Sequence, residues 1–227
     1  MTKRKRGPRT STPPPSDRRL PVLLLVLGGL ALVVVIGIVI AISGGSGDGS
    51  GDGGTAVDRD AAVFGNVTVD GTTLPQFVAT AGDPAIGLVA PTVGGETPEG
   101  DAATAGGAGE PTLVVFLAHW CPHCQVELPR LVDLTEQGAF DGVRTVAVLT
   151  GSNSDAPNFP PVPWIDREGW TGGVLLDDES STAARAFGLD SYPYVVVLDG
   201  DGAVVGRAAG ELPDSDVVAL VEAARAS

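Results

Sequence analysis

Residues 113–124 read LVVFLAHWCPHC, and they contain both cysteines of the 227-residue chain. The apolar half of this stretch predicts a strand that is buried on both faces. Residues 125–136, which follow it, predict a helix. A Cys-x-x-Cys motif at a strand-to-helix junction is typical of redox proteins with an α/β fold. The stretch therefore predicts both the fold class and a redox-active pair of cysteines.

The two cysteines take different positions if the helix begins at Pro122. Proline suits the first helical position, which needs no N–H partner, and it places Cys121 at the N-cap. The free N–H groups of the first turn and the helix dipole favour a negative charge there, and a protonated His123 favours it further. We therefore predict Cys121 as the attacking thiolate. Cys124 lies one helical turn later, so we predict it as the resolving thiol of a Cys121–Cys124 disulfide.

Three other interpretations of the cysteines stay open at this point. A structural disulfide is the first, although it would close a very short loop and stabilise the fold little. A metal site built from His119, Cys121, His123 and Cys124 is the second, but the sequence has no further cysteine or histidine to complete a zinc set. Two thiols without a function are the third. We favour redox exchange, which requires no cofactor because the electrons reside on the two sulfur atoms.

The first 57 residues predict a membrane anchor. Residues 1–19 are basic and rich in Pro, Ser and Thr, which predicts a disordered cytoplasmic tail. Residues 20–42 include a run of 21 residues without a charge, Val22 to Ile42, long enough to cross a bilayer as a helix. The basic flank predicts a cytoplasmic N-terminus. A cleaved signal peptide is the alternative, although the apolar run exceeds the usual length of such a segment.

The remainder of the chain predicts a tether and one extracytoplasmic domain. Residues 43–57 are rich in Gly, Ser and Asp and predict a flexible linker. Residues 58–227 then form the folded domain on the outer side of the cell membrane, where disulfides persist. From residue 43 onward the chain has seven arginines, no lysine and 27 of its 28 acidic residues. This charge argues against a nucleic acid as a partner.

The pattern of the domain predicts a mixed sheet with helices on both faces. Strand, helix and strand in succession predict a parallel crossover, and two apolar runs around residues 199–202 predict an antiparallel hairpin. Residues 102–109 predict an exposed loop. The predicted strands are 67–70, 74–77, 112–118, 143–149, 173–176, 194–198 and 203–207, and the predicted helices are 122–137, 164–169, 180–187 and 213–226.

Taken together, these residues resemble the membrane-anchored thioredoxin-like proteins of the TlpA and ResA type, within the redoxin group. The resemblance implies a thioredoxin fold, a mixed central sheet flanked by helices, behind a single N-terminal transmembrane helix. It rests on the strand and turn at 115–124, on Glu127 and Pro129 in the pattern Cys-x-x-Cys-x-x-Glu-x-Pro, on Tyr192-Pro193 before an apolar run, and on the final hairpin and helix.

The resemblance also assigns roles around the cysteines. Pro193 should be cis and pack beside the Cys121 sulfur, and Tyr192 should offer its backbone to a substrate segment. An ordinary trans proline is the alternative for Pro193. Trp120 should cover the site, or else serve only as a half-buried packing residue.

One position departs from thioredoxin itself, whose leading strand carries a buried aspartate. Val115 stands at the aligned position here, so a proton-relay role does not carry over to it. Glu127 is the candidate replacement for the relay, and a solvated helix residue is its alternative interpretation.

We therefore predict an extracytoplasmic thiol–disulfide oxidoreductase that acts on protein thiols or disulfides and is recycled by a membrane electron donor or acceptor. Pro122-His123 is the dipeptide of the oxidant DsbA and favours an oxidase, whereas the TlpA-type framework favours a reductase, so the direction stays open. The alternatives are a peroxidase of the redoxin group, a copper-binding chaperone that uses the cysteines and a histidine, and a redox-inactive binding domain. The residues before Cys121 lack the Pro-x-x-x-Thr-x-x-Cys setting of the peroxidases.

Overall fold

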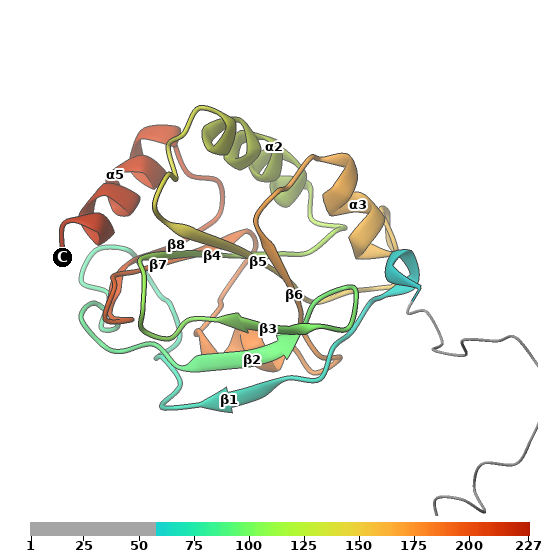
Figure 1. Cartoon of the computed structure of the whole chain (residues 1–227), viewed down its shortest axis with the longest axis horizontal. Helices are drawn as coiled ribbons and strands as arrows, with labels where there is room; N and C mark the ends of the chain where they lie inside the picture. Colours follow the sequence, from blue (N-terminus) through green and yellow to red (C-terminus); the bar gives the residue numbers. More distant parts are fainter. Residues whose placement is uncertain (1–57) are drawn as a thin grey trace, which may run out of the picture. The chain divides into compact units, whose positions relative to one another are not determined.

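The computed structural model of the chain describes residues 58–227 (Figure 1). The predicted tail (1–19), transmembrane segment (20–42) and linker (43–57) lie outside the described residues. Among the helices of residues 58–227, none combines the length and the apolar character that crossing a bilayer requires.

One mixed sheet runs through the domain. At its centre β4 (Thr112–Leu117) pairs in parallel with β5 (Arg144–Leu149), which pairs in parallel with β6 (Gly173–Leu176). On the other side of β4, β7 (Tyr194–Leu198) runs antiparallel and pairs with β8 (Val204–Ala209). The strand order is β1 (Thr68–Asp70), β2 (Thr92–Glu96), β6, β5, β4, β7 and β8. The parallel pairing of β4 with β5 and the β7–β8 hairpin confirm the predicted topology.

Helices cover both faces of the sheet, as predicted (Figure 1). α2 (Pro122–Glu136), α3 (Pro161–Arg167) and α5 (Asp214–Arg225) lie on one face, and α4 (Thr182–Ala186) lies on the other. Successive side chains of β4 point to opposite faces. Leu113 and Val115 therefore join the core under α2, whereas Val114 and Phe116 join the core under α4. Every residue of β4 is buried, as its continuous apolar run predicts.

Residues 58–110 depart most from the sequence prediction. Three short strands lie here, β1 (Thr68–Asp70), β2 (Thr92–Glu96) and β3 (Ala102–Ala105). The predicted loop at 102–109 is wrong in its first half, because β3 pairs antiparallel with β2. The predicted strand at 74–77 is also wrong. Leu74 and Phe77 are buried in the α4-side core, but their N–H groups donate to the carbonyls of Ala186 and Gly188 rather than to a strand.

A buried ion pair attaches the long segment between β1 and β2 to the sheet. The Arg207 side chain on β8 is fully buried and binds both carboxylate oxygens of Asp83, with an Nε–Oδ2 distance of 2.8 Å. Its Nη1 donates to the carbonyls of Pro75 (2.8 Å) and Phe187 (3.1 Å). The guanidinium thus binds groups at both ends of residues 75–83 and the carbonyl of Phe187, which fixes residues 75–83 beside β8.

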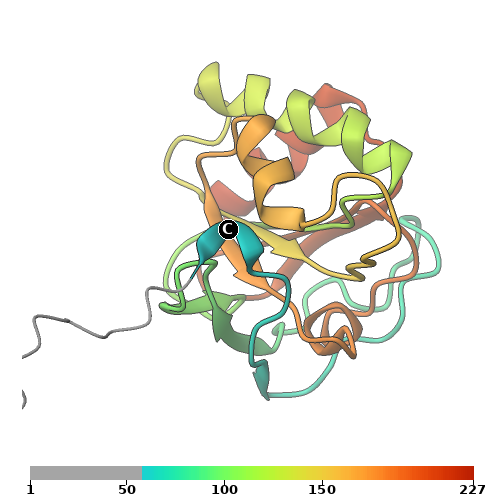
Figure 2. The ribbon, with the colours of Figure 1, turned by 90° about the vertical axis from the view of Figure 1, so that its right-hand side faces the viewer.

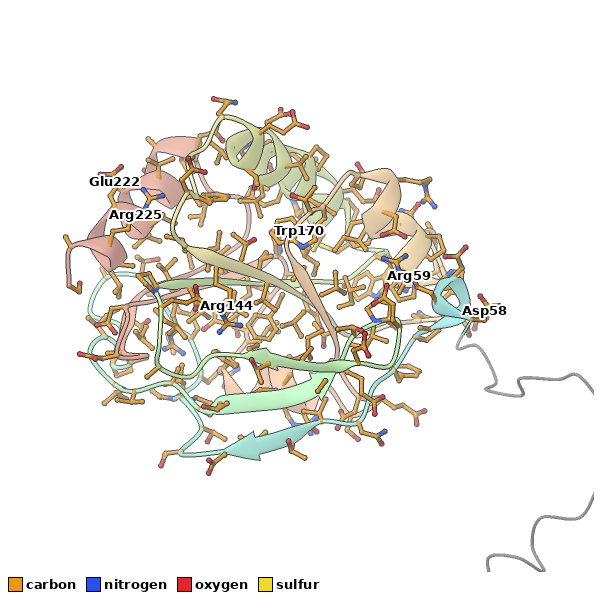
Figure 3. The ribbon with its side chains drawn as sticks, in the orientation of Figure 1. Asp58, Arg59, Arg144, Trp170, Glu222 and Arg225 are labelled. Atoms are coloured by element: carbon orange, nitrogen blue, oxygen red, sulfur yellow. The ribbon has the colours of Figure 1, made fainter. Side chains whose placement is uncertain are left out.

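The start of the domain is fixed in a similar way. Arg59, which is labelled in Figure 3, lies in the short 3-10 helix η1 (Arg59–Ala61). It binds the carboxylate of Asp166 on α3 and that of Glu99 between β2 and β3. These contacts place the residues that follow η1 beside α3. The segment around residues 63–65 is consequently held near the carboxyl ends of the parallel strands, where Gly65 N–H donates to the carbonyl of Asp177 at 3.2 Å.

Candidate active site

The Cys-x-x-Cys motif lies where the sequence predicts, between β4 and α2. Cys121 is the N-cap of α2 with an extended backbone (φ −74°, ψ 119°), and Pro122 is the first helical residue. Both cysteines are free thiols. Cys121 retains 5% of its surface, whereas Cys124 has none. Burial raises the pKa of the Cys124 thiol far above its usual range. These positions suit an attacking Cys121 and a resolving Cys124, and the two roles stay predictions.

The loop before β7 approaches Cys121 from the other side. The Tyr192–Pro193 peptide bond is cis, which confirms the conformation that the resemblance implies. The Cys121 Sγ lies 3.8 Å from the Tyr192 carbonyl oxygen, within reach of a hydrogen bond from sulfur. Burial raises the pKa of the Tyr192 hydroxyl. The backbone next to Pro193 therefore faces the sulfur that would carry a substrate, as the predicted substrate-binding role requires.

Trp120 covers one side of this arrangement. Its indole packs edge-on against the Tyr192 ring, with 5.8 Å between the ring centroids. The indole Nε1 donates to the Gly151 carbonyl at 2.7 Å. Trp120 is half-buried. Its hydrogen bond to Gly151 holds the loop after β5 against the turn that bears Cys121.

Both ring nitrogens of His119 make hydrogen bonds to backbone groups. Its Nδ1 lies 2.6 Å from the Pro157 carbonyl oxygen, and its Nε2 accepts from the Asn153 N–H at 3.1 Å. An acceptor Nε2 with a donor Nδ1 is a neutral imidazole. Burial also lowers the pKa of His119. A metal site that uses His119 would have to break one of these bonds, which disfavours His119 as the histidine of the copper-chaperone alternative.

His123 lies on the outer side of the motif, and its side chain is 67% exposed. Its Nδ1 is 2.6 Å from Glu211 Oε1, in the loop between β8 and α5. His123, which the sequence predicts as a tuning group for Cys121, therefore has an acidic partner in Glu211. The sequence analysis missed this partner.

Glu127 is buried beneath the motif, with its side chain 1% exposed. Its Oε2 accepts from Arg130 Nη1 at 3.2 Å and from the Leu212 N–H at 3.4 Å. Burial raises the pKa of Glu127, and the carboxylate in turn raises that of Cys124. The alternative interpretation of Glu127 as a solvated helix residue is wrong, because the loop before α5 covers it. Its role as a proton relay stays a prediction.

Three residues beside the site escaped the sequence analysis. Asp177 follows β6, is fully buried and accepts from the N–H groups at the start of α4. Burial raises its pKa. The Thr150 hydroxyl lies buried next to both Asp177 and Tyr192. Gly151 has a φ of +60°, and a Cβ there would lie 2.7 Å from the Tyr192 hydroxyl. An acid directly after the apolar run 173–176 is the one signal that the sequence offered.

Comparison with known proteins agrees with this geometry. Residues 71–222 match the model of the redoxin family. The chain belongs to the redoxin family. This assignment confirms the resemblance stated from the sequence and covers most of the domain that the structure describes.

Several curated proteins that are similar to this chain are named thiol:disulfide interchange proteins. The DsbE protein of Pseudomonas aeruginosa is 28% identical over 102 residues, which are 45% of this chain and 52% of that protein. The thiol-disulfide oxidoreductase ResA of Halalkalibacterium halodurans is 25% identical over 111 residues, 48% of this chain and 60% of that protein. The matches thus span little more than half of the relatives' own length.

Solved structures support the thioredoxin-like fold. A DsbE-type structure from Chlorobium tepidum aligns with a TM-score of 0.50 at 18% identity and covers 60% of this chain and 97% of that one. A Neisseria meningitidis structure assigned as a thioredoxin also aligns with a TM-score of 0.50, at 21% identity, and covers 60% and 88%. At this identity the two structures speak for the fold alone.

Proposed function

We propose that this redoxin is a thiol–disulfide oxidoreductase that exchanges its Cys121–Cys124 pair with protein substrates. The observation that carries the proposal is the position of Cys121, at the N-cap of α2 with its sulfur 3.8 Å from the backbone that precedes cis-Pro193. The relatives named as interchange proteins support the same chemistry.

In the reducing direction, the Cys121 thiolate attacks one sulfur of a substrate disulfide. The substrate S–S bond breaks, one substrate sulfur leaves as a thiolate that takes up a proton, and a mixed disulfide joins Cys121 to the other. Cys124 then loses its proton and attacks Cys121, which releases the second substrate thiol and leaves the Cys121–Cys124 disulfide. Two electrons pass from the protein to the substrate. In the oxidising direction the same steps run in reverse.

The second step requires a proton acceptor, because burial keeps Cys124 protonated. Glu127 is the carboxylate whose charge raises the pKa of Cys124. The Arg130 guanidinium and the Leu212 N–H orient this carboxylate. A raised carboxyl pKa suits a group that takes up and returns a proton near neutral pH. Glu127, which is buried beneath the motif, is therefore our proposed general base for the resolving step.

We further propose that the domain works outside the cytoplasm, tethered to the cell membrane by residues 20–42 with the N-terminus inside, and that a membrane electron donor or acceptor recycles the pair. The charge and hydropathy of residues 1–57 support this location. Labelling of a single cysteine introduced at exposed Ser180 in a Cys121→Ser, Cys124→Ser chain by a membrane-impermeant maleimide in intact cells tests it. Labelling only after lysis contradicts it.

The decisive experiment for the chemistry combines trapping and potentiometry. A Cys124→Ser chain should accumulate mixed disulfides through Cys121, whereas a Cys121→Ser chain should not. Equilibration of the wild-type chain with glutathione buffers gives the direction of exchange. A potential near about −270 mV indicates a reductase, and one near about −120 mV indicates an oxidase. Failure to form the intramolecular disulfide at any potential contradicts the proposed exchange, and rapid oxidation of Cys121 by hydrogen peroxide favours the peroxidase alternative.

A further inference from the structure

A hollow of about 450 Å³ is lined in part by the loop after β5. One wall comes from Val63 and Phe64, which follow η1, and the other from residues 152–154 and Phe159, with Glu179 at the rim. Figure 2 views the end of the molecule from which these segments come, with η1 in front and the loop before α3 beside it. The exchange chemistry described above uses none of the residues that line this hollow.

Two aromatic side chains line the hollow and stay in contact with solvent. Phe64 is 45% exposed and Phe159 is 38% exposed. The hollow thus has an apolar part, made by Val63, Phe64 and Phe159, and a polar part, made by residues 152–154 and Glu179. Exposed apolar side chains that converge on one concavity beside a few polar groups are typical of a site that binds apolar ligand groups. Phe159 is also held in place, because its ring packs against His119 with 5.8 Å between the centroids.

Hydrogen bonds within the protein fix both walls of the hollow before a substrate binds. His119 fixes the loop through the Asn153 N–H at 3.1 Å and the Pro157 carbonyl at 2.6 Å. On the opposite wall, the hydrogen bond from Gly65 N–H to the Asp177 carbonyl fixes the chain next to Phe64. A preformed hollow binds with little loss of conformational entropy in the protein.

The hollow adjoins the exchange site, because two of the residues that line it directly follow Gly151 in the chain. Trp120 donates to the Gly151 carbonyl, and Tyr192, whose carbonyl faces the Cys121 sulfur, lies against Gly151. Ser152 and Asn153 follow Gly151 directly and line the hollow. An extended peptide advances about 3.3 Å per residue. A substrate whose cysteine meets Cys121 therefore reaches the hollow within a few residues.

We propose that this hollow is a specificity pocket for the polypeptide substrate, which takes an aromatic or large aliphatic side chain a few residues from the exchanging cysteine. The proposal rests on the exchange function proposed above. Glu179 at the rim and the excess of acidic over basic residues in the domain favour a basic residue next to the apolar one. Serine in place of the apolar side chain should slow exchange by about tenfold.

A matched pair of synthetic peptides tests the proposal. Each has one cysteine as a mixed disulfide with thionitrobenzoate, flanked by arginine, with either phenylalanine or serine three residues from the cysteine. The reduced full chain releases thionitrobenzoate, and the second-order rate constant is read from absorbance. We expect the phenylalanine peptide to react about tenfold faster. Phe64→Ser and Phe159→Ser should reduce this ratio to below about twofold, whereas Val78→Ser, at a position 84% exposed outside the hollow, should retain it.

A small disulfide separates the two proposals. Reduction of 2-hydroxyethyl disulfide should proceed at the wild-type rate in all three variants, since it reaches Cys121 without the hollow. Equal rates for the two peptides, or a ratio that survives both substitutions, overturn the specificity pocket while the exchange function stands. No reduction of the small disulfide by the wild-type chain overturns the exchange function and the pocket with it. If the substitutions instead convert a dimer to a monomer and leave the peptide ratio unchanged, the hollow is an interface between two copies and the proposal is wrong.

Discussion

Replacing Glu127 with glutamine should make the domain more stable at neutral pH and less able to resolve a mixed disulfide. The carboxylate is 1% exposed, and its two hydrogen bonds, at 3.2 and 3.4 Å, are at or beyond the long end of the usual range. Burial therefore raises the pKa of Glu127 in the folded chain. Glutamine retains an acceptor for Leu212, and Arg130 is not left unpaired because it also binds Asp214. We expect a gain of about 1 kcal/mol in unfolding free energy at pH 7.

The sign of the pH dependence follows from that raised pKa. Above about pH 4.3 the unfolded chain has an ionised Glu127, and folding must then either bury the charge or bind a proton. This cost in folding free energy is absent well below that pH, and it reaches its full size above the pKa of Glu127 in the folded chain. The gain from Glu127→Gln, measured by urea unfolding, should therefore be largest at pH 7–8 and vanish near pH 4. Asp133→Asn, at an exposed carboxylate on the same helix, should show no such gain.

The kinetic half of this prediction concerns the resolving step. Without the carboxylate, release of substrate from the Cys121 mixed disulfide should slow by about a hundredfold at pH 7, the lower range for loss of a general base. Stopped-flow decay of a fluorescent mixed disulfide measures it. A glutamine variant that is less stable than the wild type at pH 7, or that resolves the mixed disulfide at the wild-type rate, would refute the reasoning.

Three further predictions address the frame around the site. Arg207→Met leaves a buried carboxylate unpaired and should lower the unfolding free energy by about 3–5 kcal/mol, measured by urea unfolding. Gly151→Ala places a Cβ against the Tyr192 hydroxyl and should slow exchange at least about tenfold, whereas Gly142→Ala, with a similar φ and open space, should not alter the exchange rate. His119 has a lowered pKa, so protonation favours the unfolded chain, and stability should fall as the pH drops below about 6.5. Replacement of His119 by glutamine should remove that dependence, as thermal unfolding at pH 5 and 7 would show.

The parts of the fold that the sequence predicts well are those whose signal is local. The run at 113–117 identifies β4 because a strand buried on both faces must be apolar throughout. Pro122 predicts the start of α2 because proline suits the first helical turn. In contrast, Leu74 and Phe77 are apolar because they fill a core from an irregular segment. A strand and a buried loop present the same pattern over so few residues.

The parts of the site that sequence reasoning missed depend on contacts between distant segments. Glu127 is polar and lies on a helix, and its burial depends on the loop at 211–214, which follows it by more than 80 residues. The acidic partner of His123, Glu211, lies in the same loop. The proposed specificity pocket combines residues 63–64, 152–154, 159 and 179, and no local pattern connects them. The cysteines and Pro193 could be predicted from the sequence because their short motifs alone are informative.

The division of the interior by the central sheet has a consequence for how this domain can change over generations. Alternate side chains of β4 serve two separate cores, and the cysteines belong to the one under α2. The core under α4 can therefore exchange one set of apolar side chains for another, at constant volume, without moving the sulfur atoms. Lineages of this domain should diverge faster on the α4 side than on the α2 side, and a designer in search of a more robust variant has the α4 side as the freer half of the molecule.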